Sequence, residues 1–177
     1  MQLWTEQAAT FALSEGQRRP DMSKYRDEIT RHYEELHRRV GHDQFLWCTR
    51  EVPNEFDLRN AAANGKVYYQ LDVPPSGIVK IVDGIVWNRI LGIQCSLPQA
   101  IRYRFDDEAA NQFPHDIAAQ RARRSELEEA FWLTAPPNGS WWSALFIDDI
   151  SRDPNGQVLV TFPLHPSWIV RTLSDVG

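Results

Sequence analysis

The sequence predicts an α+β fold, in which helices pack on a curved mixed or antiparallel sheet of about six strands. Short runs of β-branched and aromatic residues alternate with segments of helical periodicity, and turn residues alone separate the last of these runs. The composition, with 42% hydrophobic and 24% charged residues, is typical of a globular protein. A chain of 177 residues fits one domain, so residues 1–177 are expected to form a single globular unit.

The expected strands are rich in β-branched and aromatic residues and are bounded by turn residues. In chain order they cover residues 2–5, 45–49, 67–73, 78–82, 142–150, 158–162 and a short last segment at 168–171. The dipeptide Asn155-Gly156 is a strong hairpin signal, and it predicts that the two strands on either side of it are antiparallel neighbours.

The expected helices have apolar side chains every three or four residues and recognisable end signals. In chain order they cover residues 6–17, 21–41, 83–91 and 115–132. Gly16 and Gly41 are typical C-terminal helix residues. Asp21 or Ser23 can cap the second helix and Asp83 the third, because their side-chain oxygens can accept from free backbone N–H groups.

Two segments have weaker signals. Residues 53–66 are polar and rich in Asn and Ala, so we expect a loop with at most a short helical turn. Residues 99–115 are ambiguous, because 101–105 alternates like a strand while 106–112 looks helical. His115 or Asp116 then starts the helix that follows.

Several classes of protein are disfavoured by charge and hydropathy. No apolar run approaches the roughly 18 residues of a membrane span, and a basic-then-apolar leader is missing, so we expect a cytoplasmic protein with no membrane partner. The net charge of −5 disfavours binding of nucleic acid through bulk charge. Cys48 and Cys95 lie in apolar surroundings, which is typical of buried free thiols.

Sequence signatures of metal and phosphate binding are also missing. The chain has no Cys-x-x-Cys and no His-Glu-x-x-His, and His32 and His37 are five residues apart, so they do not share a helix face. Neither Gly-x-Gly-x-x-Gly nor Gly-Lys-Ser/Thr is present. We therefore expect no metal cofactor and no phosphate-binding loop.

Three features have both a structural and a chemical interpretation. The seven Trp residues are expected mainly in the core, although one or two can stack on a flat ligand in a cleft. Cys48 is expected to be an inert thiol, unless Arg50 lowers its pKa. Asp148 and Asp149 are neighbours on an expected strand, so only one of them can face a site.

A basic run, Gln120-Arg121-Ala122-Arg123-Arg124, is the densest positive segment of the chain. It can dock the backbone of a nucleic acid or an acidic protein partner. Alternatively, it forms a solvated helix face that pairs with Glu126, Glu128 and Glu129, which is the interpretation that the spacing favours.

The run Leu3-Trp4-Thr5, followed by Phe45-Leu46-Trp47-Cys48-Thr49-Arg50, resembles an uncharacterised family of small bacterial proteins that open with a Leu-Trp-Thr strand. Later matching stretches extend the resemblance loosely over most of the chain. They are Leu71-Asp72-Val73-Pro74, Val82-Asp83-Gly84-Ile85-Val86-Trp87 and Trp142-Ser143-Ala144-Leu145-Phe146-Ile147.

The order of elements is also similar to that of compact ADP-ribosyltransferase-like proteins. That resemblance implies a first strand whose polar residue holds the nicotinamide side of NAD, here Trp4, Thr5 or Gln7. It implies a second strand with an aromatic or hydroxyl residue, here Trp47 or Thr49. The late-strand glutamate of that superfamily is missing from residues 142–150.

The resemblance therefore implies an enzyme that uses NAD as substrate and modifies a nucleic-acid or protein target. Its catalytic residues would be Thr49 and an acid, either Asp148, which is nearest to the missing glutamate, or one of Glu126, Glu128 and Glu129 on the preceding helix. Arg50 would meet a phosphate. Trp4 or Trp47 would stack on nicotinamide, with Thr5 and Gln7 as further binding residues. The alternative is a non-catalytic binding module, such as an accessory protein of a toxin–antitoxin or defence system.

Overall fold

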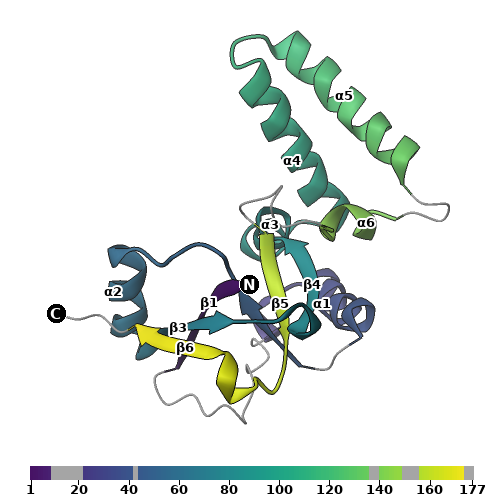
Figure 1. The fold of residues 1–177 in the computed structure, drawn as a ribbon. Coiled ribbons are helices and arrows are strands. Elements are labelled where there is room, and N and C mark those ends of the chain that lie inside the picture. Colours follow the sequence, from purple (N-terminus) through teal and green to yellow (C-terminus); the bar gives the residue numbers. More distant parts are fainter. Residues whose placement is uncertain (9–21, 42–43, 136–139, 149–155, 174–177) are drawn as a thin grey trace.

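The computed structural model describes residues 1–8, 22–41, 44–135, 140–148 and 156–173 (Figure 1). The strands are β1 (Gln2–Ala8), β2 (Phe45–Cys48), β3 (Lys66–Asp72), β4 (Ile78–Asp83), β5 (Gly156–Thr161) and β6 (Ile169–Leu173). The helices are α1 (Asp27–Val40), α2 (Glu55–Ala63), α3 (Gly84–Gly92), α4 (Leu97–Gln112), α5 (Ile117–Thr134) and α6 (Trp142–Leu145). Short 3-10 turns lie at Met22–Lys24, Pro75–Gly77 and Pro166–Trp168.

The six described strands form two antiparallel sheets of three strands, which confirms the predicted α+β class. One sheet has the order β1-β3-β6 and the other has the order β2-β5-β4. An isolated bridge joins them, because Trp4 and Thr49 exchange two backbone hydrogen bonds of 2.7 and 2.8 Å. The sheets therefore meet where β1 runs beside the end of β2.

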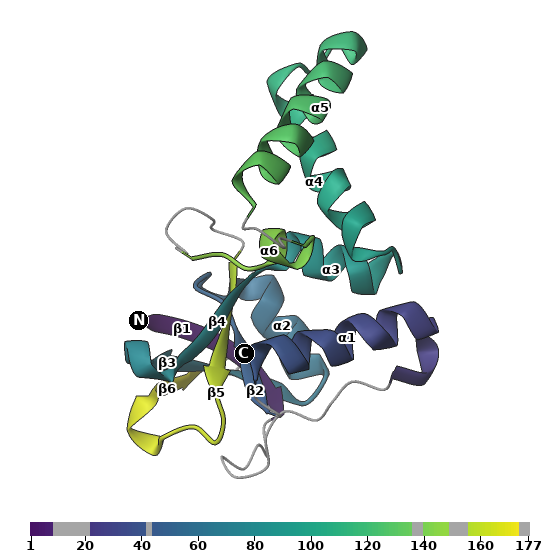
Figure 2. The ribbon, with the colours of Figure 1, turned by 90° about the vertical axis from the view of Figure 1, so that its right-hand side faces the viewer.

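Two hydrophobic clusters cover opposite faces of the β2-β5-β4 sheet. Side chains alternate along a strand, so Val158 and Val160 face one cluster while Leu159 faces the other. The first cluster contains residues of both sheets, including Leu3 and Leu71. The second cluster is formed by α1, α3, α4 and α6 against the other face (Figure 2).

Helix ends follow the local sequence at several predicted positions. Gly41 ends α1 with a φ of 75°, a left-handed conformation that glycine adopts without strain. Asp83 caps α3 by accepting from the N–H of Val86, and Asp116 caps α5 by accepting from the N–H of Ala119. Gly41 and Asp83 were predicted at these positions, and Asp116 was one of the two residues expected to start its helix.

In the middle of the chain, one expectation was wrong and one ambiguity is resolved. Residues 55–63 form a helix rather than a loop, because Asn54 and Asp57 make a capping box that satisfies free N–H groups at its start. Residues 101–105 lie within α4 rather than in a strand. Ser96 caps this helix, and its buried residues recur at helical spacing: Leu97, Ala100, Ile101, Phe105 and Ala109.

Three boundaries also differ from the expectation. Residues 6–8 continue β1 instead of starting a helix, and α1 begins at Asp27 after a 3-10 turn. Residues 142–145 form the short helix α6, in which the adjacent residues Ala144 and Leu145 are both buried, as a strand with one covered face would not allow. The hairpin expected between this segment and β5 was also wrong, because β5 pairs with β2 and β4. The rest of the expected helix at 9–17 and the turn at 153–155 lie outside the described residues.

Candidate functional site

A cavity of about 230 Å³ lies where the two sheets meet. Its walls come from four strands that are distant in the sequence. The lining residues are Trp4, Thr5 and Glu6 of β1, Trp47, Cys48 and Thr49 in and after β2, Tyr68 of β3, and Gln157 of β5. We call this space the β1–β2 cavity. It brings together four of the residues that the resemblance singled out, which are Trp4, Thr5, Trp47 and Thr49.

Buried hydrogen bonds fix the β1 side of the cavity. The hydroxyl of Thr5 donates to the backbone oxygen of Trp47 at 2.9 Å, and the amide of Gln7 donates to the Thr5 hydroxyl at 2.9 Å. Thr5 and Gln7 are 2% and 6% exposed. Gln7 is not among the lining residues, so its side chain orients Thr5 from behind instead of meeting a ligand.

Both tryptophans of the cavity have protein groups over one ring face. Trp4 is 3% exposed, and the Arg171 guanidinium lies 5.4 Å from its ring centroid. Arg171 also donates to Gln70 at 2.7 Å, which holds the guanidinium in place. Trp47 stacks on Trp87 with ring centroids 5.9 Å apart. The Trp47 indole therefore packs in the cluster on the opposite face of the β2-β5-β4 sheet from Cys48, and the contact of Trp47 with Thr5 is made by its backbone oxygen. The Trp4 indole is held beside Arg171, so its stacking with a ligand is limited to its remaining surface.

The polar groups of the cavity come mainly from β1, β3 and β5. Glu6 is a carboxylate at the cavity wall, and Lys66 pairs with it at 3.2 Å. Burial raises the pKa of Tyr68, and the carboxylates of Glu6 and Asp57 raise it further. Tyr68 therefore keeps its phenolic proton at neutral pH and can donate a hydrogen bond. Gln157 adds a side-chain amide that can both donate and accept.

Cys48 lines the same cavity but is not an activated thiol. It is 1% exposed, and burial raises its pKa to about 12, against a smaller lowering by a hydrogen bond with Thr5. Burial also raises the pKa of Cys95. Arg50, which was considered as a group that could activate Cys48, is exposed in the bend after β2. The prediction of two free, buried thiols is confirmed.

We expect both cysteines of the native protein to resist thiol reagents at pH 8. With a pKa of about 12, only about one Cys48 side chain in ten thousand is a thiolate at this pH. A thiol count with a chromogenic disulfide should find fewer than about 0.1 reactive groups per chain, and two groups in guanidinium. Ser143→Cys, at an exposed position of α6, is the reactive control. Rapid labelling of native Cys48 would contradict this expectation.

The expected catalytic acid is not near the cavity. Asp148 is exposed and follows the segment that bridges to β4, where the N–H of Ile147 donates to Ile81. Since β4 lies between this segment and β5, Asp148 is not among the cavity residues. Asp149 lies outside the described residues. The late strand that contributes to the cavity is β5, and its lining residue is Gln157.

Glu6, Tyr68 and Gln157 were missed by the sequence reasoning. Gln157 follows Gly156 of the Asn-Gly hairpin signal, so the sequence marked the start of this strand without indicating which residue faces a cavity. Tyr68 lies opposite Glu6 in the β1–β3 pairing, and this register became known only from the structure. Gln157 cannot ionise, so it cannot replace the missing glutamate as an acid.

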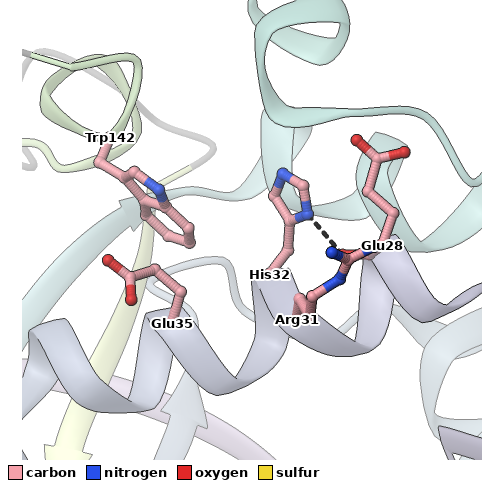
Figure 3. Close-up of a pocket in the computed structure, with 5 residues that line it drawn as sticks. All are labelled: Glu28, Arg31, His32, Glu35 and Trp142. Carbon is pink, nitrogen blue, oxygen red and sulfur yellow. Dashed lines mark hydrogen bonds between the residues drawn. The ribbon is translucent and has the colours of Figure 1, made fainter.

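A second cavity, of about 370 Å³, lies between α1 and α6 (Figure 3). It is lined by Glu28, Arg31, His32, Glu35 and Trp142. Figure 3 shows Glu35 and His32 projecting from α1 on the side of Trp142. Hydrogen bonds from Arg38, assisted by Arg39, lower the pKa of Glu35 to about 2. This carboxylate is therefore charged and already engaged with two arginines.

His32 is also fully engaged in this second cavity. Its Nε2 accepts from the N–H of Leu97 at 3.2 Å, so its Nδ1 carries the proton and donates to the backbone oxygen of Glu28 at 2.6 Å. One histidine thus connects α1 to the first turn of α4. We interpret the second cavity as a helix junction, since its histidine and one of its carboxylates already have partners within the protein.

The remaining expectations concern metals, the basic run and the membrane. Within the described ranges, no group of three or more metal-binding side chains is found, and no helix is long and apolar enough to cross a membrane.

In the basic run at residues 120–124, Arg123 pairs with Glu126 at 3.2 Å and Arg124 pairs with Asp106 at 3.3 Å. Arg124 also lies 4.0 Å from Glu128. The expected pairing with Glu126 and Glu128 is therefore confirmed for these two arginines, which are half-buried and also pair with α4 rather than forming a solvated face.

The chain has no detectable relative in three comparisons. No known protein family, no curated protein and no solved structure matches it significantly.

Proposed function

We propose that this is an ADP-ribosyltransferase-like protein whose β1–β2 cavity binds the nicotinamide end of NAD, for transfer of ADP-ribose to a nucleic-acid or protein target. One observation supports the proposal above all others. Candidates for both strand positions line one cavity: Trp4 and Thr5 for the first strand, and Trp47 and Thr49 for the second. The two pairs come from the two different sheets, and they meet at the Trp4–Thr49 bridge and at the hydrogen bond from Thr5 to Trp47.

The chemistry of the lining suits a nicotinamide ring with its carboxamide. The indole of Trp4 supplies a flat apolar wall, and the phenol of Tyr68 and the amide of Gln157 supply hydrogen bonds. The volume of about 230 Å³ is below the roughly 300–1,000 Å³ of sites that enclose a whole ligand. One end of NAD would therefore enter the cavity, and the adenosine end would lie outside, where exposed Arg50 can meet a phosphate.

ADP-ribosyl transfer also needs an acid beside the ribose. The bond between nicotinamide and the ribose breaks, nicotinamide leaves with the electron pair, and a nucleophile of the target bonds to the ribose and loses a proton. A nearby carboxylate stabilises the oxocarbenium-like transition state. Glu6 is the carboxylate among the lining residues, so we assign this role to Glu6 in place of Asp148. Thr49, which follows β2 and pairs with Trp4, remains the second proposed catalytic residue.

A thermal melt with NAD, followed by an assay of nicotinamide release, tests the proposal. NAD at 100 times its dissociation constant should stabilise the protein by about 2.7 kcal/mol, or about 5–11 °C in Tm. Glu6→Gln should keep the Tm shift and slow nicotinamide release by about 100-fold or more. Glu34→Gln, at an exposed position of α1, is the matched control and should change neither quantity. A flat melt without nicotinamide release would refute the proposal.

The second candidate is a non-catalytic module that binds NAD or ADP-ribose without reaction. It is favoured by the amide of Gln157 at the cavity position of the late strand and by the location of Asp148 outside the cavity. Gln157→Glu separates the two candidates. In a transferase-like cavity the added carboxylate should raise nicotinamide release, whereas binding without release in both proteins would favour the non-catalytic module.

A further inference from the structure

One face of the β1-β3-β6 sheet continues from the β1–β2 cavity toward β6. Side chains that lie directly opposite each other on paired strands share a face of the sheet. Glu6 lies opposite Tyr68, and the next row on the same face consists of Trp4, Gln70 and Arg171. Trp4, Glu6 and Tyr68 line the cavity, whereas Gln70 and Arg171 do not. Arg171 is therefore a cation on the cavity's face of the sheet, one row away from Tyr68.

The Arg171 guanidinium is held in one orientation by uncharged groups. Its Nε donates to the side-chain oxygen of Gln70 at 2.7 Å, and the guanidinium lies 5.4 Å from the ring centroid of Trp4. Gln70 is 7% exposed, and its amide nitrogen donates to the side-chain oxygen of Gln2 at 3.4 Å. This second bond directs the oxygen of Gln70 toward Arg171. Side chains of β1 and β3 thus position a cation of β6.

Arg171 has no anionic partner in the part of the chain that the structure describes. Arg59 and Arg104, by comparison, pair with carboxylates at 3.3 and 2.7 Å. Glu6, which shares the face of Arg171, pairs with Lys66 at 3.2 Å. Because Gln70 occupies Nε and Arg171 is exposed, the two terminal amino groups of the guanidinium form its open edge. A fixed guanidinium with an open edge suits two oxygens of a phosphate.

We propose that Arg171 binds a phosphate of the nucleotide whose nicotinamide end enters the β1–β2 cavity. This inference rests on the proposed function and adds a phosphate site to it besides Arg50. Tyr68 and Arg171 are diagonal neighbours on paired strands, which places their Cα atoms roughly 7–8 Å apart. In NAD, one ribose separates the nicotinamide ring from the first phosphate, so a ring beside Tyr68 brings that phosphate toward Arg171. Gln70 is a positioning residue, because it acts on the phosphate through Arg171.

Calorimetric titration with a matched pair of ligands tests the phosphate contact. Nicotinamide mononucleotide contains the ring, the ribose and one phosphate, and nicotinamide riboside lacks only the phosphate. Arg171→Gln should weaken binding of the mononucleotide and of NAD by about 10- to 100-fold, the usual effect of losing a hydrogen bond to a charged group. Binding of the riboside should not change. Arg121→Gln, at an exposed position of α5 away from both sheets (Figure 1), is the matched control and should change none of the three affinities.

A second variant tests the positioning role of Gln70. Gln70→Glu has nearly the same shape, and it puts a carboxylate against Nε of Arg171, so the guanidinium stays in place while its charge is compensated. The affinity for the mononucleotide should fall, and the affinity for the riboside should stay the same. Equal weakening of both ligands would contradict this role, because a general disturbance of the sheet affects the cavity as well. Thermal melts without ligand verify that each variant is folded.

Inorganic pyrophosphate separates a failure of this inference from a failure of the proposed function, because it has phosphates and no ring. Binding of pyrophosphate that is lost in Arg171→Gln, without any binding of the riboside, would support the phosphate site and refute the nicotinamide cavity. Equal affinity for NAD in the wild type and in Arg171→Gln would overturn the phosphate site and leave the cavity standing. If none of these ligands binds, both proposals are overturned.

Discussion

Replacing Asp83 by alanine should lower the free energy of unfolding by about 3 kcal/mol, the low end of the cost of breaking a buried ion pair. Asp83 is 1% exposed and ends β4. Its Oδ1 accepts from the N–H of Val86 at 3.0 Å and caps α3, while its Oδ2 accepts from Arg104 at 2.7 Å. The side chain thus joins β4, α3 and α4. We place the effect at the low end because the Arg104 side chain is 36% exposed and can turn to water.

Equilibrium unfolding in urea measures this effect. Asp116→Ala is the matched control, because Asp116 also caps a helix but lies exposed. It should cost only about 1 kcal/mol, the usual effect of losing a cap. Asp83→Asn should lie between the two, since its amide oxygen can still accept from Val86. Equal losses in Asp83→Ala and Asp116→Ala would mean that the Arg104 contact adds nothing to stability.

Replacing Trp4 by alanine should cost about 3–5 kcal/mol, the usual range for deleting a buried aromatic side chain. Trp4 is 3% exposed, lies under Arg171, and forms the backbone bridge between the two sheets. A loss of this size is a large part of the roughly 5–15 kcal/mol of a typical domain. Any loss of NAD binding in this variant would therefore report unfolding as well as a missing contact.

Urea unfolding and a binding titration separate these two effects of Trp4. Trp4→Phe keeps an aromatic ring and should lose about 1–2 kcal/mol, so NAD binding can be measured on a folded protein. Arg171→Lys removes the planar guanidinium above the ring while it keeps the charge, and it serves as the control for that contact. A loss below about 1 kcal/mol in Trp4→Ala would show that the ring adds little to the junction of the sheets.

Local signals in the sequence predicted the ends of helices better than their presence. Asp83, Asp116 and Gly41 act where expected, because a cap depends on a few neighbouring residues. Helix α2 was missed because its polar face hides the apolar periodicity, although Asn54 and Asp57 form a capping box. The aromatic run from Trp142 was taken for a strand, because a short buried helix and a short buried strand have similar composition.

The candidate site depended on contacts between distant segments. The resemblance placed Trp4, Thr5, Trp47 and Thr49 together, and the structure has all four in one cavity. Gln157 was not predictable, because its position depends on the pairing of β5 with β2 and β4. Asp148 was expected on a strand at residues 142–150 that borders the site. Instead, residues 142–145 are helical and residues 146–147 lie along β4, so Asp148 is not among the cavity residues. Patterns along the chain cannot determine which strands become neighbours.

The central place of β5 has a consequence for the growing chain during synthesis. β2 and β4 are made early, but both pair with β5, which begins only at residue 156. Until the ribosome has released that segment, each of the two strands has an unpaired edge. α4 and α5, which are adjacent in sequence, can fold against each other in the meantime. We therefore expect nascent chains that stop before residue 156 to contain the helical hairpin and to aggregate through β2 and β4.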